Sequence, residues 1–298
     1  MARGLKPAAV ASVERLLGGD AISWDAVVSR GYAVGERWIV RLADGRSAFV
    51  KVGVEDWMVD NMRAEMTVYS QVDAPFLPRV LAWAEDETPP LLVLEDLSGA
   101  EWPPPWTAEH VQAVMTTLDE VAATPPPPGL RRLEDDFGSG WDAVAADPAP
   151  FLSLGVASQA WLETTLDALR VAEKTTPFAG SELVHCDARS DNLCIRDGRA
   201  ILFDWNWARV GNAAIDYAFW LPTLRLEDGP RVADMAEKRP ACAAFAACVA
   251  GFFASRAGLP EPPTAPGVRA FQLAQLEVAL PWATGVHGLP QPDGRIRA

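Results

Sequence analysis

The sequence of 298 residues is poor in several features that mark whole classes of protein. It has 3 histidines and 4 cysteines, and the cysteines form no CxxC pair and no zinc-finger spacing with histidine. The longest nearly apolar run, 241–254, is shorter than the roughly 20 residues of a membrane-spanning helix. The P-loop motif GxxxxGK[ST] does not occur. These absences argue against a disulfide or zinc scaffold, a helical membrane protein and a P-loop protein.

Basic residues are also few. Lys and Arg number 26 against 40 Asp and Glu, which gives a formal net charge of −14. The electric field of this negative net charge repels nucleic acids and anionic lipid surfaces. We therefore expect no nucleic-acid partner and no membrane partner. The N-terminus lacks the apolar block of a secretory signal, and with the unpaired cysteines this predicts a cytoplasmic location. The sequence leaves the oligomeric state unknown.

Strand signals gather in the first third of the chain and helix signals in the rest. The early signals are a short amphipathic helix before residue 20, a hairpin at Asp44-Gly45, a helix at about 56–71 and strands at 79–84 and 91–94. After residue 101 the pattern is mostly helical, for example over 108–123. The fold class predicted from this order is α+β, in two lobes.

Two runs of prolines interrupt the chain, at 103–105 and 125–128, and neither can form a helix or a central strand. The first run predicts the boundary between the lobes. We therefore expect an N-lobe over residues 1–100 and a C-lobe over residues 101–298. After the second run, the chain as far as about residue 154 is predicted to be a loop-rich insertion.

The most informative stretch runs from residue 183 to residue 204. Asp197-Gly198 lies between two short apolar runs and predicts a tight hairpin, in which Asn192 falls opposite Phe203. Asn192 and Asp204 would then meet at the open end of the hairpin. An amide oxygen beside a carboxylate is a sparse oxygen site, which suits Mg²⁺ because this ion completes its shell with water and phosphate oxygens.

Asp187 lies five residues before Asn192, on the loop that enters this hairpin. A carboxylate beside a metal–phosphate site can accept the proton of an attacking hydroxyl. Arg189 follows two residues later and is placed to offset charge on a transferring phosphoryl group. For each of these residues alone, a merely polar hairpin mouth is the better explanation. Their joint pattern favours a catalytic site.

The run His185-x-Asp187-x-Arg189-x-x-Asn192, followed by Asp204-Trp205-Asn206, resembles the catalytic and metal-binding motifs of kinase-fold enzymes. With its hairpin, the stretch is similar to the aminoglycoside phosphotransferase-like family of small-molecule kinases. The resemblance implies a two-lobed protein-kinase-like fold, with a small antiparallel-sheet N-lobe and a larger helical C-lobe. It also implies ATP and Mg²⁺ as cofactors, with GTP left open as the nucleotide.

The resemblance further implies a lysine and a glutamate that grip the nucleotide phosphates as an ion pair. Lys51 lies within an apolar strand, where an unpaired cation is costly, and Glu65 lies at the edge of the apolar face of the following helix. These two residues fit that pair. A solubilising lysine on an edge strand is the alternative for Lys51 alone.

Other roles come from the resemblance alone. Ser29 and Gly31 would belong to the loop that covers the phosphates, although the segment carries only two glycines and is not a full GxGxxG. The backbone of Glu95 and Leu97 would meet the adenine edge.

The residues flanking the motif have supporting roles by the same resemblance. Asp216 would hold the catalytic loop by accepting backbone N–H bonds, and His185 would link that loop to the core. Cys186 stands where relatives often have glycine, and Asn206 where an acid is frequent.

Asp216 follows Asp204 by only twelve positions, which leaves no room for the peptide-docking segment of a protein kinase. This spacing favours a small-molecule acceptor. Together with it, the resemblance implies an ATP-dependent O-phosphotransferase that moves the γ-phosphate to a hydroxyl of a small molecule, with an aminoglycoside or other antibiotic as the leading candidate. A metabolic kinase for choline, homoserine or a sugar is one alternative. A catalytically silent kinase-like binding protein is another, which the joint retention of Lys51, Asp187, Asn192 and Asp204 disfavours.

The acceptor itself is less constrained by the sequence. Acidic groups would suit a cationic acceptor, and solvated loop charges are the alternative explanation for them. The candidate acceptor residues are Glu134, Asp135, Asp136, Trp205, Trp207, Glu227, Asp228 and Glu277.

Overall fold

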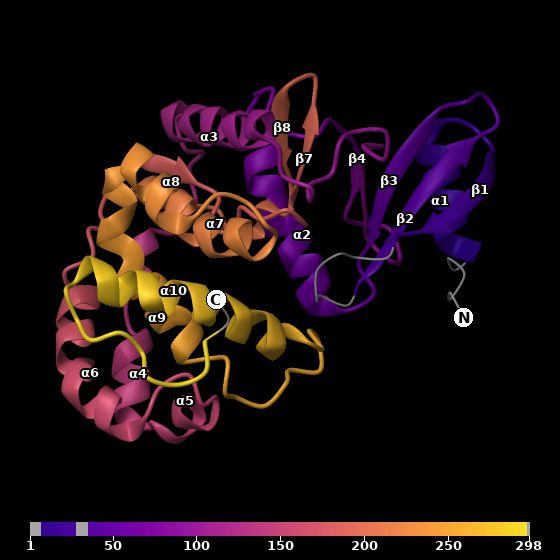
Figure 1. The fold of residues 1–298 in the computed structure, drawn as a ribbon. Coiled ribbons are helices and arrows are strands. Elements are labelled where there is room, and N and C mark those ends of the chain that lie inside the picture. Colours follow the sequence, from indigo (N-terminus) through magenta and orange to yellow (C-terminus); the bar gives the residue numbers. More distant parts are fainter. Residues whose placement is uncertain (1–6, 28–34, 297–298) are drawn as a thin grey trace.

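The computed structural model describes residues 7–27 and 35–296, and its two lobes confirm the α+β prediction (Figure 1). A five-stranded antiparallel sheet forms the core of the N-lobe, with strand order β1-β2-β3-β5-β4. Its elements in chain order are α1 (Pro7–Leu17), β1 (Ala21–Ala26), β2 (Glu36–Leu42), β3 (Ser47–Val52), α2 (Asp56–Tyr69), β4 (Val80–Ala84) and β5 (Leu91–Glu95).

The two faces of this sheet have different partners because side chains alternate along each strand. Trp38, Val40 and Val50 are buried in a small core with Val13 of α1. The opposite face turns Ile39, Phe49 and Lys51 towards a cavity between the lobes. The alternation of β2 and β3 therefore separates a packing face from a cavity-facing one.

The C-lobe is built mainly of helices around the larger hydrophobic core. Helix α3 (Ala108–Ala123) has the predicted bounds: the Thr107 side chain accepts from the His110 N–H at its start, and the prolines at 125–128 follow its end. The helices that follow later in the C-lobe are α6 (Gln159–Lys174), α7 (Ala214–Leu226), α8 (Val232–Lys238), α9 (Ala246–Ala254) and α10 (Val268–Val286).

Four short strands complete the C-lobe. β6 (Glu182–Val184) pairs with β9 (Arg209–Gly211), and β7 (Leu193–Arg196) pairs with β8 (Arg199–Leu202). The loop after β6 and the hairpin β7–β8 hold the motif singled out in the sequence. The domain boundary between residues 100 and 101 stays a prediction.

The loop-rich insertion predicted as far as residue 154 is partly wrong, because α4 (Gly140–Ala146) and α5 (Ala149–Ser153) lie within it. The Glu173 carboxylate of α6 caps α4 by accepting from the N–H groups of Gly140 (3.0 Å) and Trp141 (2.9 Å). This long-range cap stabilises a helix of only seven residues that has little local signal of its own. Across residues 7–27 and 35–296, no helix is both long and apolar enough to span a bilayer.

Candidate active site

The hairpin β7–β8 has the register expected from its turn. Arg196 lies opposite Arg199 and Cys194 opposite Ile201, while the Phe203 N–H donates to the Asn192 carbonyl oxygen at 3.1 Å. Asp197 and Gly198 both have positive φ (53° and 73°), the requirement of a two-residue type I′ turn. Asn192 and the residue before Asp204 therefore close the open end of the hairpin as predicted.

Both outer edges of this hairpin are also hydrogen-bonded. Ile195 and Glu101 exchange two backbone hydrogen bonds, with N–H to oxygen distances of 2.7 and 2.9 Å. On the other edge the Leu202 N–H donates to the Phe76 carbonyl oxygen at 2.8 Å. The linker after β5 and the loop before β4 thus fix the hairpin from both sides.

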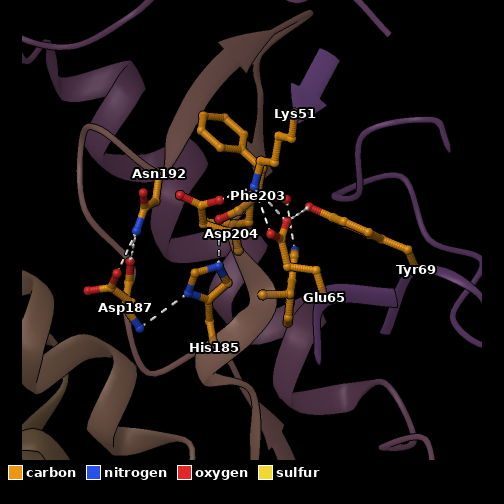
Figure 2. Close-up of polar contacts among 10 residues, drawn as sticks. Lys51, Glu65, Tyr69, His185, Asp187, Asn192, Phe203 and Asp204 are labelled. Atoms are coloured by element: carbon orange, nitrogen blue, oxygen red, sulfur yellow. Dashed lines mark hydrogen bonds and ion pairs between the residues drawn. The ribbon is translucent and has the colours of Figure 1, made fainter. Parts of the chain in front are cut away.

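Asn192 and Asp187 are directly joined. The Asn192 Nδ2 donates to the Asp187 carboxylate at 2.7 Å and to the Asp187 carbonyl oxygen at 3.0 Å (Figure 2). Because the nitrogen side of the amide is committed to Asp187, the amide oxygen is the atom that a cation would meet.

The pKa of the Asp187 carboxyl group lies close to neutral pH. Burial raises the pKa of Asp187 to about 7, although the Arg189 guanidinium acts in the opposite direction. The Arg189 Nε lies 3.4 Å from the Asp187 carboxylate, and its Nη2 donates to Asp191 at 3.0 Å. Arg189 also stacks over the Phe271 ring of α10, 5.3 Å from the centroid. The guanidinium is therefore held beside the predicted base by two carboxylates.

Lys51 joins the two lobes through carboxylates. Its Nζ lies 2.8 Å from both Glu65 oxygens and also pairs with Asp204, as the dashed lines in Figure 2 show. The Lys51 and Glu65 side chains are 9% and 3% exposed, so water does little to screen the pair. Although burial opposes it, the carboxylates of Asp204 and Glu65 raise the pKa of Lys51. Lys51 therefore stays charged, as its predicted role requires.

Asp204 has a strained backbone and an ionised side chain. Its φ is +63°, a left-handed conformation that is uncommon for residues other than glycine. Burial alone would raise its pKa, but the Lys51 and Arg37 cations lower the pKa of Asp204 to about 2. The carboxylate is therefore negatively charged throughout the neutral range, which a metal ligand requires.

Hydrogen bonds to Asp216 and His185 fix the loop that carries Asp187. The Asp216 carboxylate accepts from the N–H groups of His185 (2.8 Å) and Cys186 (2.7 Å), which confirms the expectation for Asp216. The His185 Nε2 donates to the Phe203 carbonyl oxygen at 3.1 Å, and its Nδ1 accepts from the Asp187 N–H at 3.2 Å. His185 thus links the loop to the hairpin.

Cys186 has a φ of +62°, in the left-handed region. Only glycine adopts this conformation without steric cost. The structure therefore gives a physical reason for the glycine that the family resemblance places at this position.

A single cavity of about 440 Å³ unites the predicted site. Its walls come from the cleft face of the N-lobe sheet, from α2, from the linker after β5 and from the hairpin. Eight predicted site residues line it, namely Lys51, Glu65, Glu95, Leu97, Asp187, Arg189, Asn192 and Asp204. Ser29 and Gly31 lie outside the described residues.

Glu95 and Leu97 make contacts that fix the linker. The Glu95 carboxylate pairs with Arg196 of β7 at 2.8 Å and accepts from the Arg79 N–H at 2.9 Å. The Leu97 carbonyl oxygen accepts from the Ala100 N–H and from the Trp102 Nε1, each at 3.0 Å.

The acceptor-pocket expectations need one correction. Trp205 is fully buried, with its ring 4.5 Å from that of His185, and so cannot reach an acceptor. Its neighbour Trp207 is 49% exposed and lines the cavity. Of the acidic insertion residues, Asp136 pairs with Arg209 and Glu134 with Arg132, so arginines already balance these charges.

Several cavity-lining residues were not singled out in the sequence. They come from β2, α2 and the linker, and include Arg37, Trp57, Asn61 and Trp102. Because helix and strand periodicity alone does not tell which loop or which lobe faces a given side chain, these residues carried no separate signal.

The donor set at the hairpin mouth fits Mg²⁺. Asp204 supplies a carboxylate and Asn192 an amide oxygen, both on the cavity wall. The part of the chain that the structure describes contains no group of three or more His, Cys, Asp or Glu residues able to hold a metal by themselves. A cation here would need water and phosphate oxygens as further ligands, which is the habit of Mg²⁺.

Comparisons with known proteins agree with this geometry. A family profile described as "Phosphotransferase enzyme family" matches residues 23–248. Among solved structures, a thermostable mutant of aminoglycoside phosphotransferase APH(4)-Ia, in a ternary complex with ADP and hygromycin B, shares 16% identity at a TM-score of 0.59. That match covers 94% of this chain and 97% of the other.

Two macrolide-modifying proteins are similar as well. Macrolide 2'-phosphotransferase MphH from Brachybacterium faecium, as apoenzyme, shares 16% identity, with 94% and 91% of the chains covered and a TM-score of 0.51. A macrolide 2'-phosphotransferase type I shares 15% identity, with 96% and 94% covered and a TM-score of 0.52. At such low identity these structures establish the shared fold.

No curated protein matches the sequence. The family profile, in contrast, spans well over half of the chain, from β1 to α9. On that match and on the kinase-like fold, the chain belongs to the phosphotransferase enzyme family.

Proposed function

We propose that the protein transfers the γ-phosphate of ATP to a hydroxyl group of a small molecule. The observation that carries this proposal is the convergence on one cavity wall of Lys51 paired with Glu65 and Asp204, and of Asp187 paired with Asn192. A cation for phosphates, two oxygen ligands and a carboxylate base are the groups that phosphoryl transfer needs.

The roles of the residues follow from their contacts. Lys51, held by Glu65, binds nucleotide phosphates, and Asn192 and Asp204 hold Mg²⁺, which neutralises charge on the phosphate oxygens when bound. Asp187 accepts the proton of the acceptor hydroxyl. The hydroxyl oxygen forms a bond to the γ-phosphorus while the bond between that phosphorus and the ADP oxygen breaks. Arg189, beside Asp187, offsets negative charge on the transferring group. Glu95 and Leu97 bind the adenine ring of the nucleotide through their backbone.

An antibiotic is the leading acceptor class. The support comes from similar structures whose names record hygromycin B as a ligand or macrolides as substrates. Within the cavity, the aromatic side chain of Trp207 and the amides of Asn61 and Asn206 are uncharged groups that suit stacking and hydrogen bonding to a glycoside ring.

The test is an acceptor screen. The purified protein is incubated with Mg-ATP and one compound at a time from panels of aminoglycosides, macrolides, hydroxylated amines, sugars and nucleosides. ADP release is followed by a coupled assay, and the product is checked by mass spectrometry for one added phosphoryl group. We expect acceptor-dependent ADP release with the antibiotics. Release with only an amine or sugar metabolite would replace the antibiotic class, and failure to bind Mg-ATP would overturn the proposal.

A further inference from the structure

Arg37 is a second cation on the sheet face that carries Lys51. Strands β2 and β3 pair antiparallel, with Arg37 directly opposite Lys51. Directly opposed residues project from the same face, with Cβ atoms roughly 5 Å apart. The neighbouring pair on that face, Ile39 and Phe49, lines the same cavity as Arg37 and Lys51. The Arg37 and Lys51 side chains therefore enter the cleft from the same face of the sheet.

The guanidinium lies beside Gly35 at the wall of the cavity. A Cβ added to Gly35 would lie only 3.2 Å from the Arg37 Nη1, so the side chain folds against the Gly35 backbone. Gly35 itself lines the cavity. Arg37 is thus a wall of the cleft rather than a solvent-directed surface residue.

The charge of Arg37 acts on the residues at the phosphate end of the cleft. It helps to lower the pKa of Asp204, after Lys51, and it opposes the charging of Lys51. Glu65 and Asp204 already pair with Lys51, so the guanidinium is a further positive charge at this end of the cleft, and it attracts an incoming polyanion. A guanidinium is also suited to phosphate, because its planar fork can donate two parallel hydrogen bonds.

We propose that Arg37 binds the phosphate chain of the nucleotide together with Lys51. The inference rests on the proposed function, because it requires the nucleotide to occupy this cavity. The inference goes beyond the proposed function because it assigns a share of phosphate binding to a side chain of β2. The segment before β2 is not a full GxGxxG, so it has few glycines that would let its backbone bind a phosphate closely.

The test compares nucleotide affinities of the wild type and of Arg37→Met by isothermal titration calorimetry, with ATP and ADP in the presence of Mg²⁺ and with adenosine alone. We expect the Kd of ATP and ADP to rise roughly tenfold to a hundredfold, as for loss of a charge-assisted hydrogen-bonded contact. The Kd of adenosine should not change. Arg37→Lys, which keeps the charge but loses the fork, should fall between the two and also serves if the Met variant fails to fold.

Arg41→Met is the matched control. Arg41 lies on the same strand, is exposed, pairs with Asp25 and is outside the cavity lining, so its loss removes the same charge without touching the cleft. Unchanged ATP affinity in Arg37→Met, or equal weakening of ATP and adenosine, would overturn the inference and leave the proposed function standing. A wild-type protein that binds neither ATP nor ADP would overturn both.

Discussion

The side-chain amide of Asn192 donates to the Asp187 carboxylate across 2.7 Å. This contact joins the residue proposed to hold the metal to the residue proposed to accept the proton. It fixes which oxygen of Asp187 is engaged and which end of the Asn192 amide is left for a cation. This hydrogen bond therefore orients both the proposed base and the proposed metal ligand, and the two roles can be tested separately by substitution.

Replacing Asp187 tests the proposed base. Asp187→Asn should lower kcat by roughly 10²- to 10⁴-fold, the usual contribution of general base catalysis, because an amide cannot accept the hydroxyl proton. The Kd of ADP, measured by calorimetry, should stay at its wild-type value. Asp197→Asn is the control, since this exposed turn residue has a positive φ that asparagine tolerates. A near-wild-type kcat in Asp187→Asn would refute the assignment.

Replacing Asp204 tests the metal site. In the wild type, Mg²⁺ should tighten ADP binding, and removal of the metal with EDTA should abolish phosphoryl transfer. In Asp204→Asn, ADP affinity should be the same with and without Mg²⁺, because the carboxylate ligand is gone. Titrations of ADP at several Mg²⁺ concentrations measure the difference. Persistence of the full magnesium effect in the variant would place the metal elsewhere.

The stability of the fold should depend on pH through His185. Burial lowers the pKa of His185 from 6.5 to about 4, so between these values the folded state binds fewer protons than the unfolded state. The contribution of His185 to stability is therefore lost as pH falls through this window, and a shift of this size corresponds to roughly 3 kcal/mol.

Urea unfolding of the wild type and of His185→Gln at pH 7, 6, 5 and 4 measures this contribution. Glutamine does not titrate, so the stability difference between the two proteins should shrink towards acid pH. A difference that stays constant over the series would show that His185 is not the titrating group.

The linker should favour ATP over GTP. Two N–H donors, from Ala100 and Trp102, already occupy the Leu97 carbonyl oxygen. Guanine presents N–H donors on the edge where adenine presents an acceptor, so it would need an oxygen of this kind. We expect kcat/KM for ATP to exceed that for GTP by about tenfold or more, the worth of one hydrogen bond.

Trp102→Phe should narrow this ratio, because it removes one donor from the Leu97 oxygen. Trp106→Phe is the matched control, since the Trp106 Nε1 donates instead to Glu227. An ATP-to-GTP ratio that is unaffected in Trp102→Phe would mean that the Leu97 oxygen does not select the base.

The parts of the structure that could be predicted from the sequence are those determined by neighbouring residues in the chain. Asp197-Gly198 specifies a two-residue turn, and that turn alone fixes the register from Arg196–Arg199 to Asn192–Phe203. Helix α3 was predictable because its apolar period, its Thr107 cap and the prolines after it all agree.

The position of Arg37 opposite Lys51 could not be predicted from neighbouring residues alone. The hairpin at Asp44-Gly45 closes with three loop residues, because the Leu42 N–H donates to the Arg46 carbonyl oxygen and Gly45 has a φ of +86°. A two-residue turn at Asp44-Gly45 would instead shift the register by one residue and move Arg37 away from Lys51. The sequence marks a turn here but not its length, and that length decides which face Arg37 occupies.

Tertiary contacts account for the other differences. Helix α4 depends on a cap from Glu173, which lies 33 residues away along the chain from Gly140. Trp205 is a candidate acceptor residue in the sequence, yet its indole Nε1 donates to the Leu202 carbonyl oxygen inside the core. Both outcomes depend on partners that neighbouring residues do not reveal.

The hairpin that holds Asn192 and Asp204 has neither edge free, since Glu101 covers β7 and Phe76 covers β8. The amide protons of Ile195 and Leu202 are therefore buried and hydrogen-bonded to segments outside the hairpin. Their exchange with deuterated water should require the hairpin to separate from the linker after β5 and from the loop before β4. The two residues proposed to bind the metal would then keep their relative position for as long as these contacts hold.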